Sequence, residues 1–296
     1  MKKDLLGLGA AVAVAATSIY GLMSDAHAAD EVNVYSYRQP ILIEPMFEAF
    51  TAETGIKVNV VYAKKGLDQR LEEEGQNSPA DLIMSVDIGR LSSIVNKGLT
   101  QAVDSDVLKS NIPAHLRSTE DQWFALTTRA RIVYASKDRV TEGELTTYED
   151  LADPKFEGRI CTRAGNHSYN LALIASMIET HGEAKAEDWL RGVKANLARK
   201  PQGNDRAQVK AIWQGECDIS IGNTYYMGKM LADPEQVPWA ESVRIIFPNQ
   251  DDRGTHINVS GVSMTKYAPN RENALKLMEF LSEDKAQAMY AEVNYE

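Results

Sequence analysis

Apolar positions along residues 31–98 recur first as short continuous runs and then at spacings of three or four, and the two patterns alternate. Short runs bounded by turn residues predict β-strands, whereas the wider spacing predicts helices with one apolar face. The predicted strands are residues 32–35, 56–62 and 81–85, and the predicted helices are residues 43–53, 67–74 and 88–96. This alternation predicts a parallel sheet covered on both faces, with ligands at the carboxyl ends of its strands.

A second alternating series occupies the later part of the chain. It follows a polar, irregular stretch, residues 100–122, and an apolar stretch, residues 123–134, which predicts either a pair of strands or one long crossing strand. Further helices are predicted at residues 169–180, 184–196, 206–214 and 270–290, and a strand-like segment at residues 254–265. Two β/α units joined by extended crossings predict an α/β protein whose two lobes form a clamp.

The first residues of the chain have the form of a cleavable secretory signal. Lys2 and Lys3 precede the apolar run 5–16, and Ala26-His27-Ala28 has the small-x-small form of a cleavage site. The run is too short to anchor the chain stably across a bilayer. We therefore expect a signal peptide at residues 1–28, export of the mature chain and no transmembrane helix in it.

The negative net charge of the chain limits which partners it can bind. The formal net charge is −10, and the signal segment carries equal numbers of lysines and aspartates. The mature chain therefore keeps this negative charge. Nucleic-acid binding needs a basic surface, so we expect no nucleic-acid partner. The charge is compatible with a cation as the ligand.

The two cysteines, Cys161 and Cys217, each occur in a strand-like segment, residues 159–162 and 217–220. An exported protein enters an oxidising compartment, where cysteines can pair. If the two strands are neighbours, the sulfur atoms come within disulfide reach. We expect a disulfide, and two buried free thiols are the alternative.

Two adjacent tyrosines, Tyr225 and Tyr226, lie where a predicted strand gives way to a predicted helix. Asn223 and Thr224 are both suitable N-caps for that helix. Two phenol side chains in a first helical turn can converge on one atom beyond the helix end, and the helix dipole there favours their ionised forms. The alternative is that both are partly buried packing residues, as tyrosines commonly are.

Several segments spread over the mature chain carry a family resemblance. They are residues 34–39, 78–81, 123–131, 165–170, 200–205 (Lys-Pro-Gln-Gly-Asn-Asp) and 223–226 (Asn-Thr-Tyr-Tyr). In these segments the chain resembles the periplasmic ferric-iron-binding proteins of ABC importers, which have the type II periplasmic binding protein fold. The resemblance implies that Tyr169, Tyr225 and Tyr226 are iron ligands and that Arg129 lies near the iron and its accompanying anion.

The chain departs from the family pattern in its first lobe. Gln39, Pro40 and Val86 stand where some members have further iron ligands. What remains resembles the all-tyrosine subgroup, in which carbonate or another synergistic anion completes the coordination. Tyr37 is either an additional ligand or a hydrogen-bond donor. Further candidates for holding the anion or supporting the ligands are Arg38, Gln39, Asn166 and Asn223.

The chemistry of ferric iron agrees with this set of residues. Ferric iron is a hard cation that prefers oxygen donors, and a phenolate is such a donor. Three phenolates offset its charge, and a carbonate adds negative charge that the forked guanidinium of Arg129 can balance. Backbone N–H groups of residues 163–166, ahead of a predicted helix, are a second candidate for holding the anion.

The resemblance also implies an organisation and a role. We expect a first lobe of residues 29–129, completed by residues 256–280, and a second lobe of residues 130–255. The C-terminal helix, residues 281–296, is expected near the hinge, with the ligand cleft between the lobes. The implied protein is a periplasmic monomer without catalysis that delivers ferric iron to the ABC permease in the inner membrane.

Two other functions are compatible with parts of the sequence. The same fold can bind a small organic ligand such as a polyamine, thiamine or a phosphonate. A secreted metal-dependent enzyme is the rival from another class, and it needs an open coordination position beside a base. The histidines at positions 115, 167, 181 and 256 are scattered, without an H-E-x-x-H pattern, and no convincing base is found.

Overall fold

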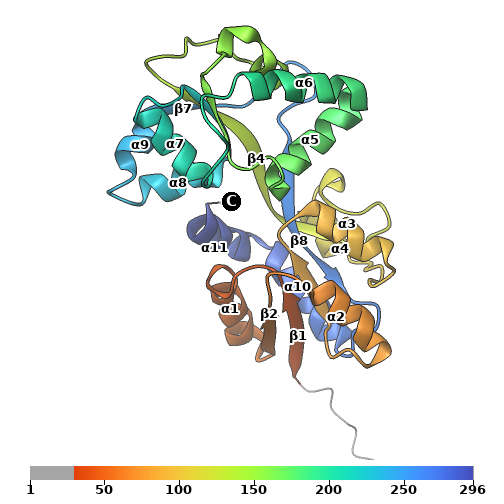
Figure 1. Ribbon diagram of the computed structural model, residues 1–296. Helices are drawn as coiled ribbons and strands as arrows, with labels where there is room; N and C mark the ends of the chain where they lie inside the picture. The colour runs from red at the N-terminus through yellow and green to blue at the C-terminus, as the bar shows by residue number, and fades with distance from the viewer. Residues whose placement is uncertain (1–29, 296) are drawn as a thin grey trace, which may run out of the picture.

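The computed structural model describes residues 30–295, and the predicted signal peptide at residues 1–28 lies outside them. Two lobes of strands and helices lie one above the other, and two long strands, β4 and β8, run between them (Figure 1). One path of paired strands runs through both lobes in the order β2-β1-β3-β8-β4-β6-β5, and β7 pairs with β4 beside it. In the described part of the chain, no helix is long and apolar enough to cross a membrane.

The first lobe begins with the predicted β/α alternation. Its strands are β1 (Glu31–Ser36), β2 (Lys57–Tyr62) and β3 (Leu82–Ser85), and its first helices are α1 (Glu44–Thr54), α2 (Leu67–Glu74) and α3 (Ile88–Asn96). Strand β1 pairs in parallel with both β2 and β3, as predicted. Helix α1 buries Met46, Phe47 and Phe50, and it ends at Gly55, whose φ of 74° favours glycine.

Strand β4 (Phe124–Ser136) resolves the alternative that the sequence left open, because it is one continuous strand. It pairs with β8 (Ile257–Met264) from Phe124 to Ala130 and with β6 from Arg131 onward. β4 is thus shared by both lobes, and its partner changes between Ala130 and Arg131. Both β4 and β8 run antiparallel to their neighbours, which differs from the parallel pairing within each lobe.

The second lobe contains the remaining strands and five helices. The strands are β5 (Ile160–Cys161), β6 (Ile219–Asn223) and β7 (Val243–Ile246). The helices are α5 (Ser168–His181), α6 (Glu183–Ala195), α7 (Asp205–Trp213), α8 (Tyr225–Leu231) and α9 (Val237–Glu241).

Short 3₁₀ helices occur in both lobes. They are η1 to η5, and they cover residues 40–42, 75–77, 114–116, 149–152 and 154–156.

Two predictions of secondary structure were wrong. The stretch predicted to be irregular contains α4 (Asp106–Asn111), which the Ser105 hydroxyl caps by accepting from the backbone N–H of Leu108. The helix predicted at residues 270–290 is two helices, α10 (Arg271–Ser282) and α11 (Asp284–Asn294). They separate at Glu283, where the backbone is extended and the Gln287 side chain donates to the Leu281 carbonyl.

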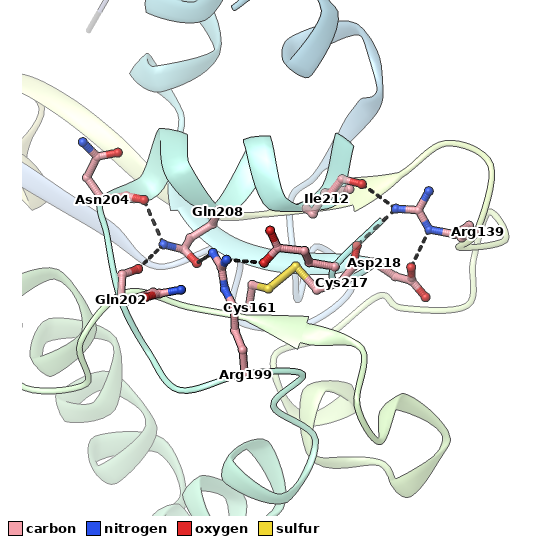
Figure 2. Close-up of a disulfide and its surroundings, with 10 residues drawn as sticks. Arg139, Cys161, Arg199, Gln202, Asn204, Gln208, Ile212, Cys217 and Asp218 are labelled. Atoms are coloured by element: carbon pink, nitrogen blue, oxygen red, sulfur yellow. Dashed lines mark hydrogen bonds and ion pairs between the residues drawn. A yellow bond between two sulfur atoms is a disulfide. The ribbon is translucent and has the colours of Figure 1, made fainter. Parts of the chain in front are cut away.

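The predicted disulfide between Cys161 and Cys217 is confirmed, with Cα atoms 5.9 Å apart (Figure 2). It forms because β5 and β6 are parallel neighbours, with Ile160 opposite Ile219 and Cys161 opposite Ser220. It therefore joins β5 to the segment that enters β6. The Asp218 carboxylate, next to Cys217 in the chain, pairs with the Arg139 guanidinium at 2.6 Å.

Separate hydrophobic cores hold the two lobes. One core includes Phe50, Leu82 and Phe280, and Ala286 and Tyr290 of α11 belong to it. Two other cores lie in the second lobe, on either side of its strands. Helix α11 thus packs in the first-lobe core. The boundaries predicted for the lobes stay predictions; the change of partner along β4 falls one residue after the predicted boundary at residue 129.

Candidate functional site

The structure brings Tyr169, Tyr225 and Tyr226 together from two helices. Tyr169 lies in the first turn of α5, and the tyrosine pair lies in the first turn of α8. The Tyr225 hydroxyl donates to the Tyr169 hydroxyl at 3.1 Å, and the rings of Tyr225 and Tyr226 lie 4.4 Å apart between centroids. Three phenol groups therefore share one small volume, as an iron site built on them requires.

The start of α8 is not capped as expected. Thr224 is the N-cap residue, but its backbone is helical and its side chain makes no capping hydrogen bond. Its hydroxyl instead accepts from the Ala130 N–H at 3.3 Å, and its own N–H donates to the Ala130 carbonyl at 3.1 Å. Asn223 does not cap the helix either, because it still belongs to β6. The helix that carries the tyrosine pair is thus tied to β4 at the point where β4 changes partner.

The start of α5 is capped by a histidine. The Nδ1 atom of His167 accepts from the Tyr169 N–H at 3.2 Å, and the two rings meet edge to face at 4.5 Å. Burial and the nearby Arg163 guanidinium lower the pKa of His167, so the ring is neutral at pH 7. His167 is half-buried and positions Tyr169.

A buried ion cluster lies behind the tyrosines. The fully buried Asp205 carboxylate pairs with Arg131 at 2.8 Å and with Arg163 at 3.1 Å, and it accepts from the Asn223 N–H at 3.2 Å. Arg131 also donates to the side-chain oxygens of Asn170 at 2.6 Å and Asn223 at 3.0 Å. This cluster joins β4, β6, α5 and α7. It fixes the two helix starts that carry the tyrosines.

This ion cluster was not predicted from the sequence, although Arg131 and Asp205 both lie in segments that carry the family resemblance. Asp205 directly follows Asn204, which caps α7 by accepting from the Ala207 N–H. In the sequence, Asp205 is therefore indistinguishable from an ordinary acidic residue in the first turn of a helix. Arg131 is a buried charged residue of β4 that directly precedes the apolar run 132–135. Asn223, which was a candidate, does reach the tyrosines, because its side-chain nitrogen lies 3.4 Å from the Tyr225 hydroxyl oxygen.

Burial controls the protonation of the tyrosine pair. It raises the pKa of Tyr225 far above its ordinary value, and the adjacent Tyr169 and Tyr226 raise it further. Burial likewise raises the pKa of Tyr226. The expected help from the helix dipole is therefore outweighed, and both phenols are neutral at pH 7. Their ionisation requires a cation placed directly against the oxygen atoms.

The tyrosines line a cleft of about 550 Å³ that also touches the first lobe and the end of α11. Five basic side chains contribute to its lining, and we call them the cleft cations: Arg38, Lys64, Arg90, Arg129 and Lys229. None of the described residues that line the cleft is an aspartate or a glutamate. The lining of the cleft is therefore basic and suits an anion, and phenol oxygens are the type of donor that a hard metal ion prefers.

Tyr37 lines the cleft from the first lobe, but its oxygen atom is already engaged. Its hydroxyl donates to the Asp68 carboxylate at 2.6 Å and accepts from the Asp68 N–H at 2.9 Å. Burial and the bond to Asp68 raise the pKa of Tyr37. The Arg90 guanidinium lies 3.8 Å from its ring centroid. These contacts favour a supporting role for Tyr37 over the role of an iron ligand.

Of the residues predicted to hold the anion or support the ligands, some line the cleft and one does not. Arg129 lines the cleft, and its guanidinium donates to the Ser260 hydroxyl at 3.1 Å and to the Val86 carbonyl. Arg38 is buried at the cleft, 3.4 Å from the Thr127 hydroxyl, and the exposed Gln39 lies at its edge. Asn166 is exposed and is not among the residues that line the cleft, so the structure does not bring it to the site.

The conventional metal ligands do not form a competing site. Within residues 30–295, no group of three His, Cys, Asp or Glu side chains is arranged to hold a metal ion. The tyrosine cluster, in contrast, brings phenol oxygens together beside a cleft.

Comparison with known proteins places this architecture in a family. The sequence matches the family described as bacterial extracellular solute-binding protein over residues 77–295. The chain belongs to this family. The solute-binding protein is 47% identical to iron uptake protein A1 of Synechocystis over 269 residues, which cover 90% of this chain and 75% of that relative.

Two solved structures of similar solute-binding proteins match the fold closely. Ferric iron-binding protein A of Mannheimia haemolytica, in an open conformation, superposes with a TM-score of 0.83 at 56% identity, covering 90% of this chain and 84% of that one. A Trichodesmium protein in complex with iron and citrate superposes with a TM-score of 0.84 at 44% identity, covering 89% and 84%. The expected type II periplasmic binding protein fold and the family of ferric-iron-binding proteins are thus confirmed. The family consists of binding proteins, so this chain is a binding protein and not an enzyme.

Proposed function

We propose that this solute-binding protein captures ferric iron in the tyrosine cleft, with Tyr169, Tyr225 and Tyr226 as ligands. The observation that carries the proposal is the meeting of three phenol groups, two of them 3.1 Å apart between oxygens, in a cleft whose described lining contains no carboxylate. The names of similar proteins, iron uptake protein A1 and ferric iron-binding protein A, support it.

Iron capture follows from the chemistry of the phenols. Each phenol gives up a proton as its oxygen binds the metal, because the nearby cation stabilises the phenolate. Three phenolates then offset the three positive charges of ferric iron. The phenols are neutral in the metal-free protein, and a softer or weakly charged ion stabilises their ionised forms much less than ferric iron does. The site therefore favours a small, highly charged cation.

The remaining coordination positions fall to a small anion, and we propose carbonate. Ferric iron generally binds about six donors, and the residues Gln39 and Val86 supply no strong ligand from the first lobe. The cleft cations attract an anion to this place, and the forked guanidinium of Arg129 is the group that we expect to bind it. A volume of about 550 Å³ also admits a larger polycarboxylate. The Trichodesmium relative holds citrate with its iron, so citrate is the alternative anion.

Delivery completes the proposed role. The predicted signal peptide sends the chain to the periplasm, where we expect a monomer that carries iron to the ABC permease of the inner membrane. Membership in the extracellular solute-binding family supports this route. The disulfide agrees with an oxidising compartment.

A ferric titration of the purified mature protein tests the proposal. Ferric iron supplied as a weak chelate, in bicarbonate buffer, should produce a visible phenolate-to-iron charge-transfer band that saturates at one iron per chain. Citrate in place of bicarbonate distinguishes the two anions by the position of the band. A protein that stays colourless while iron is shown not to bind contradicts the proposal.

An organic anion is the second candidate ligand, and one observation favours it. The cleft contains five cations and no carboxylate among its lining residues. Such a lining repels a polyamine or thiamine, both of which are cationic, whereas it suits a phosphonate. A metal-free protein that binds a phosphonate tightly by calorimetry, and gives no coloured ferric complex, would favour this second function.

A further inference from the structure

A second cavity, of about 280 Å³, lies in the second lobe away from the cleft cations. Residues of helices α5 and α6, which are neighbours in Figure 1, line it together with Leu197 and Pro201. Its volume is room for roughly nine water-sized groups. The residues that line it and those that line the tyrosine cleft are different.

The wall of this second cavity is almost entirely apolar. The apolar residues that line it are Leu173, Ile174, Trp189, Leu190, Val193, Leu197, Pro201 and Ile221. The indole N–H of Trp189 donates to the Tyr148 carbonyl at 2.7 Å, so only the apolar part of the ring is left for the cavity. An open apolar hollow of this size is a common form of small-ligand site.

One charge lies at the edge of the second cavity. The Lys194 side chain contributes to its lining and is exposed, and no carboxylate in residues 30–295 lies within ion-pair distance of its ammonium group. Among the described residues, no aspartate or glutamate lines the cavity. The site thus combines an apolar interior with one unpaired positive charge at its rim.

We propose that this cavity binds a small amphipathic carboxylate, with the apolar body between α5 and α6 and the carboxylate beside Lys194. Removal of the apolar body from water supplies the affinity, and the ion pair at the rim sets the orientation and the preference for an anion. A straight chain of about eight carbons matches the volume when its carboxylate stays at the rim.

The second cavity shares one wall residue with the support of the tyrosine site. Asn170 lines the cavity, and its side chain also accepts from Arg131 at 2.6 Å and donates to the Arg163 carbonyl at 3.2 Å. Tyr169 is the preceding residue. The cavity and the support of the Tyr169 segment therefore share this side chain, although binding in the cavity requires no metal.

Calorimetric titration of the metal-free mature protein with octanoate tests the proposal. Octanoate and octan-1-ol are expected to bind at one site per chain, and octylammonium more weakly than either. Ile174→Trp fills the cavity and should abolish binding, whereas Ile178→Trp, on the exposed side of the same helix, should not. Lys194→Gln should weaken octanoate about two- to fivefold, the worth of an exposed ion pair, and leave octan-1-ol unchanged. Lys185→Gln on the same helix is the matched control.

Location and folding are checked in the same samples. Methyl-labelled protein should show octanoate shifts at Leu173 and Leu190, and if Ile174→Trp does not fold, Leu190→Trp replaces it. Absence of saturable binding, binding that survives the filling variant, or shifts confined to residues of the tyrosine cleft would overturn the site. Equal effects of Lys194→Gln and Lys185→Gln would overturn the assignment of a carboxylate.

Discussion

The Tyr225 hydroxyl donates a hydrogen bond of 3.1 Å to the Tyr169 hydroxyl, across 56 positions of sequence and between two different helices. In the metal-free protein this bond is held by a proton, since burial keeps the Tyr225 phenol neutral. A metal ion that binds both oxygens must displace that proton. The contact thus links the geometry of the cluster to its protonation.

Removing single phenol oxygens should weaken iron binding without unfolding the protein. Tyr225→Phe and Tyr226→Phe each delete one oxygen and little volume, and we expect ferric affinity to fall by more than about a hundredfold. Tyr267→Phe, at a half-exposed position outside the cleft, is the control and should keep wild-type affinity. Competition with a coloured chelator measures the constants. Unchanged affinity in both cleft variants would rule out the tyrosine pair as ligands.

Iron affinity should rise with pH over the neutral range. Burial raises the pKa of Tyr225 and Tyr226 above 10.0, so both phenols carry protons there when the metal is absent. Each proton displaced on binding changes the affinity about tenfold per pH unit, in the direction of weaker binding in acid. Titration at pH 6, 7 and 8 gives the number of protons released. A flat profile would mean that the bound tyrosines keep their protons.

Loss of the anion or of Arg129 should alter the iron complex itself. Depletion of bicarbonate, and separately Arg129→Ala, should weaken ferric binding and shift the visible band, because the anion completes the coordination and the guanidinium balances it. Arg129 also contacts the Ser260 hydroxyl and the Val86 carbonyl, so a melting curve must accompany each titration. An identical band and affinity with and without bicarbonate would mean that the protein alone completes the coordination, with Tyr37 the first residue to examine.

The buried ion cluster should support both stability and iron binding. Asp205→Asn leaves the guanidinium groups of Arg131 and Arg163 without their carboxylate in a buried place. Breaking a buried pair in this way costs about 3 kcal/mol or more in the free energy of unfolding. Urea unfolding measures this cost. Asp218→Asn, which affects the partly exposed pairs with Arg139 and Arg159, should cost less than about 1 kcal/mol.

The disulfide should stabilise the second lobe. In the chain-entropy account, a crosslink between residues separated by 56 positions contributes up to about 4 kcal/mol to the free energy of unfolding. We expect the double variant Cys161→Ser, Cys217→Ser to melt at a lower temperature than the oxidised protein. The reduced wild-type protein should match the variant. Equal melting temperatures for the oxidised protein, the reduced protein and the double variant would show that the hydrogen bonds between β5 and β6 stabilise this part of the second lobe without the disulfide.

Local pattern was enough to predict the strongly periodic elements. Helices α2 and α3 occupy the predicted residues, because each has a clear apolar face and a glycine or polar residue at its end. The break between α10 and α11 was not predictable in this way. It depends on side chains such as Gln287, which bonds to a carbonyl of the preceding helix.

The family resemblance named three tyrosines that the structure brings together, but it did not describe their surroundings. The residues 169, 225 and 226 do meet, and Asn223 reaches them. Their protonation and support depend on contacts that join distant segments, and a sequence pattern does not contain these. Asp205 is the example, since its role appears only when β4, β6 and α7 are packed together. Asn166 is the converse, a residue near Tyr169 in sequence that faces solvent.

The two hydrogen bonds between Ala130 and Thr224 have a mechanical consequence. Ala130 is the last residue of β4 that pairs with β8, and Thr224 directly precedes the tyrosine pair. Bending of β4 at this point would reorient the backbone N–H and carbonyl of Ala130, to which Thr224 is bonded. The first turn of α8 would then move with them. Through these two bonds the start of α8, with its two phenols, is coupled to the backbone of β4 where that strand passes from one lobe to the other.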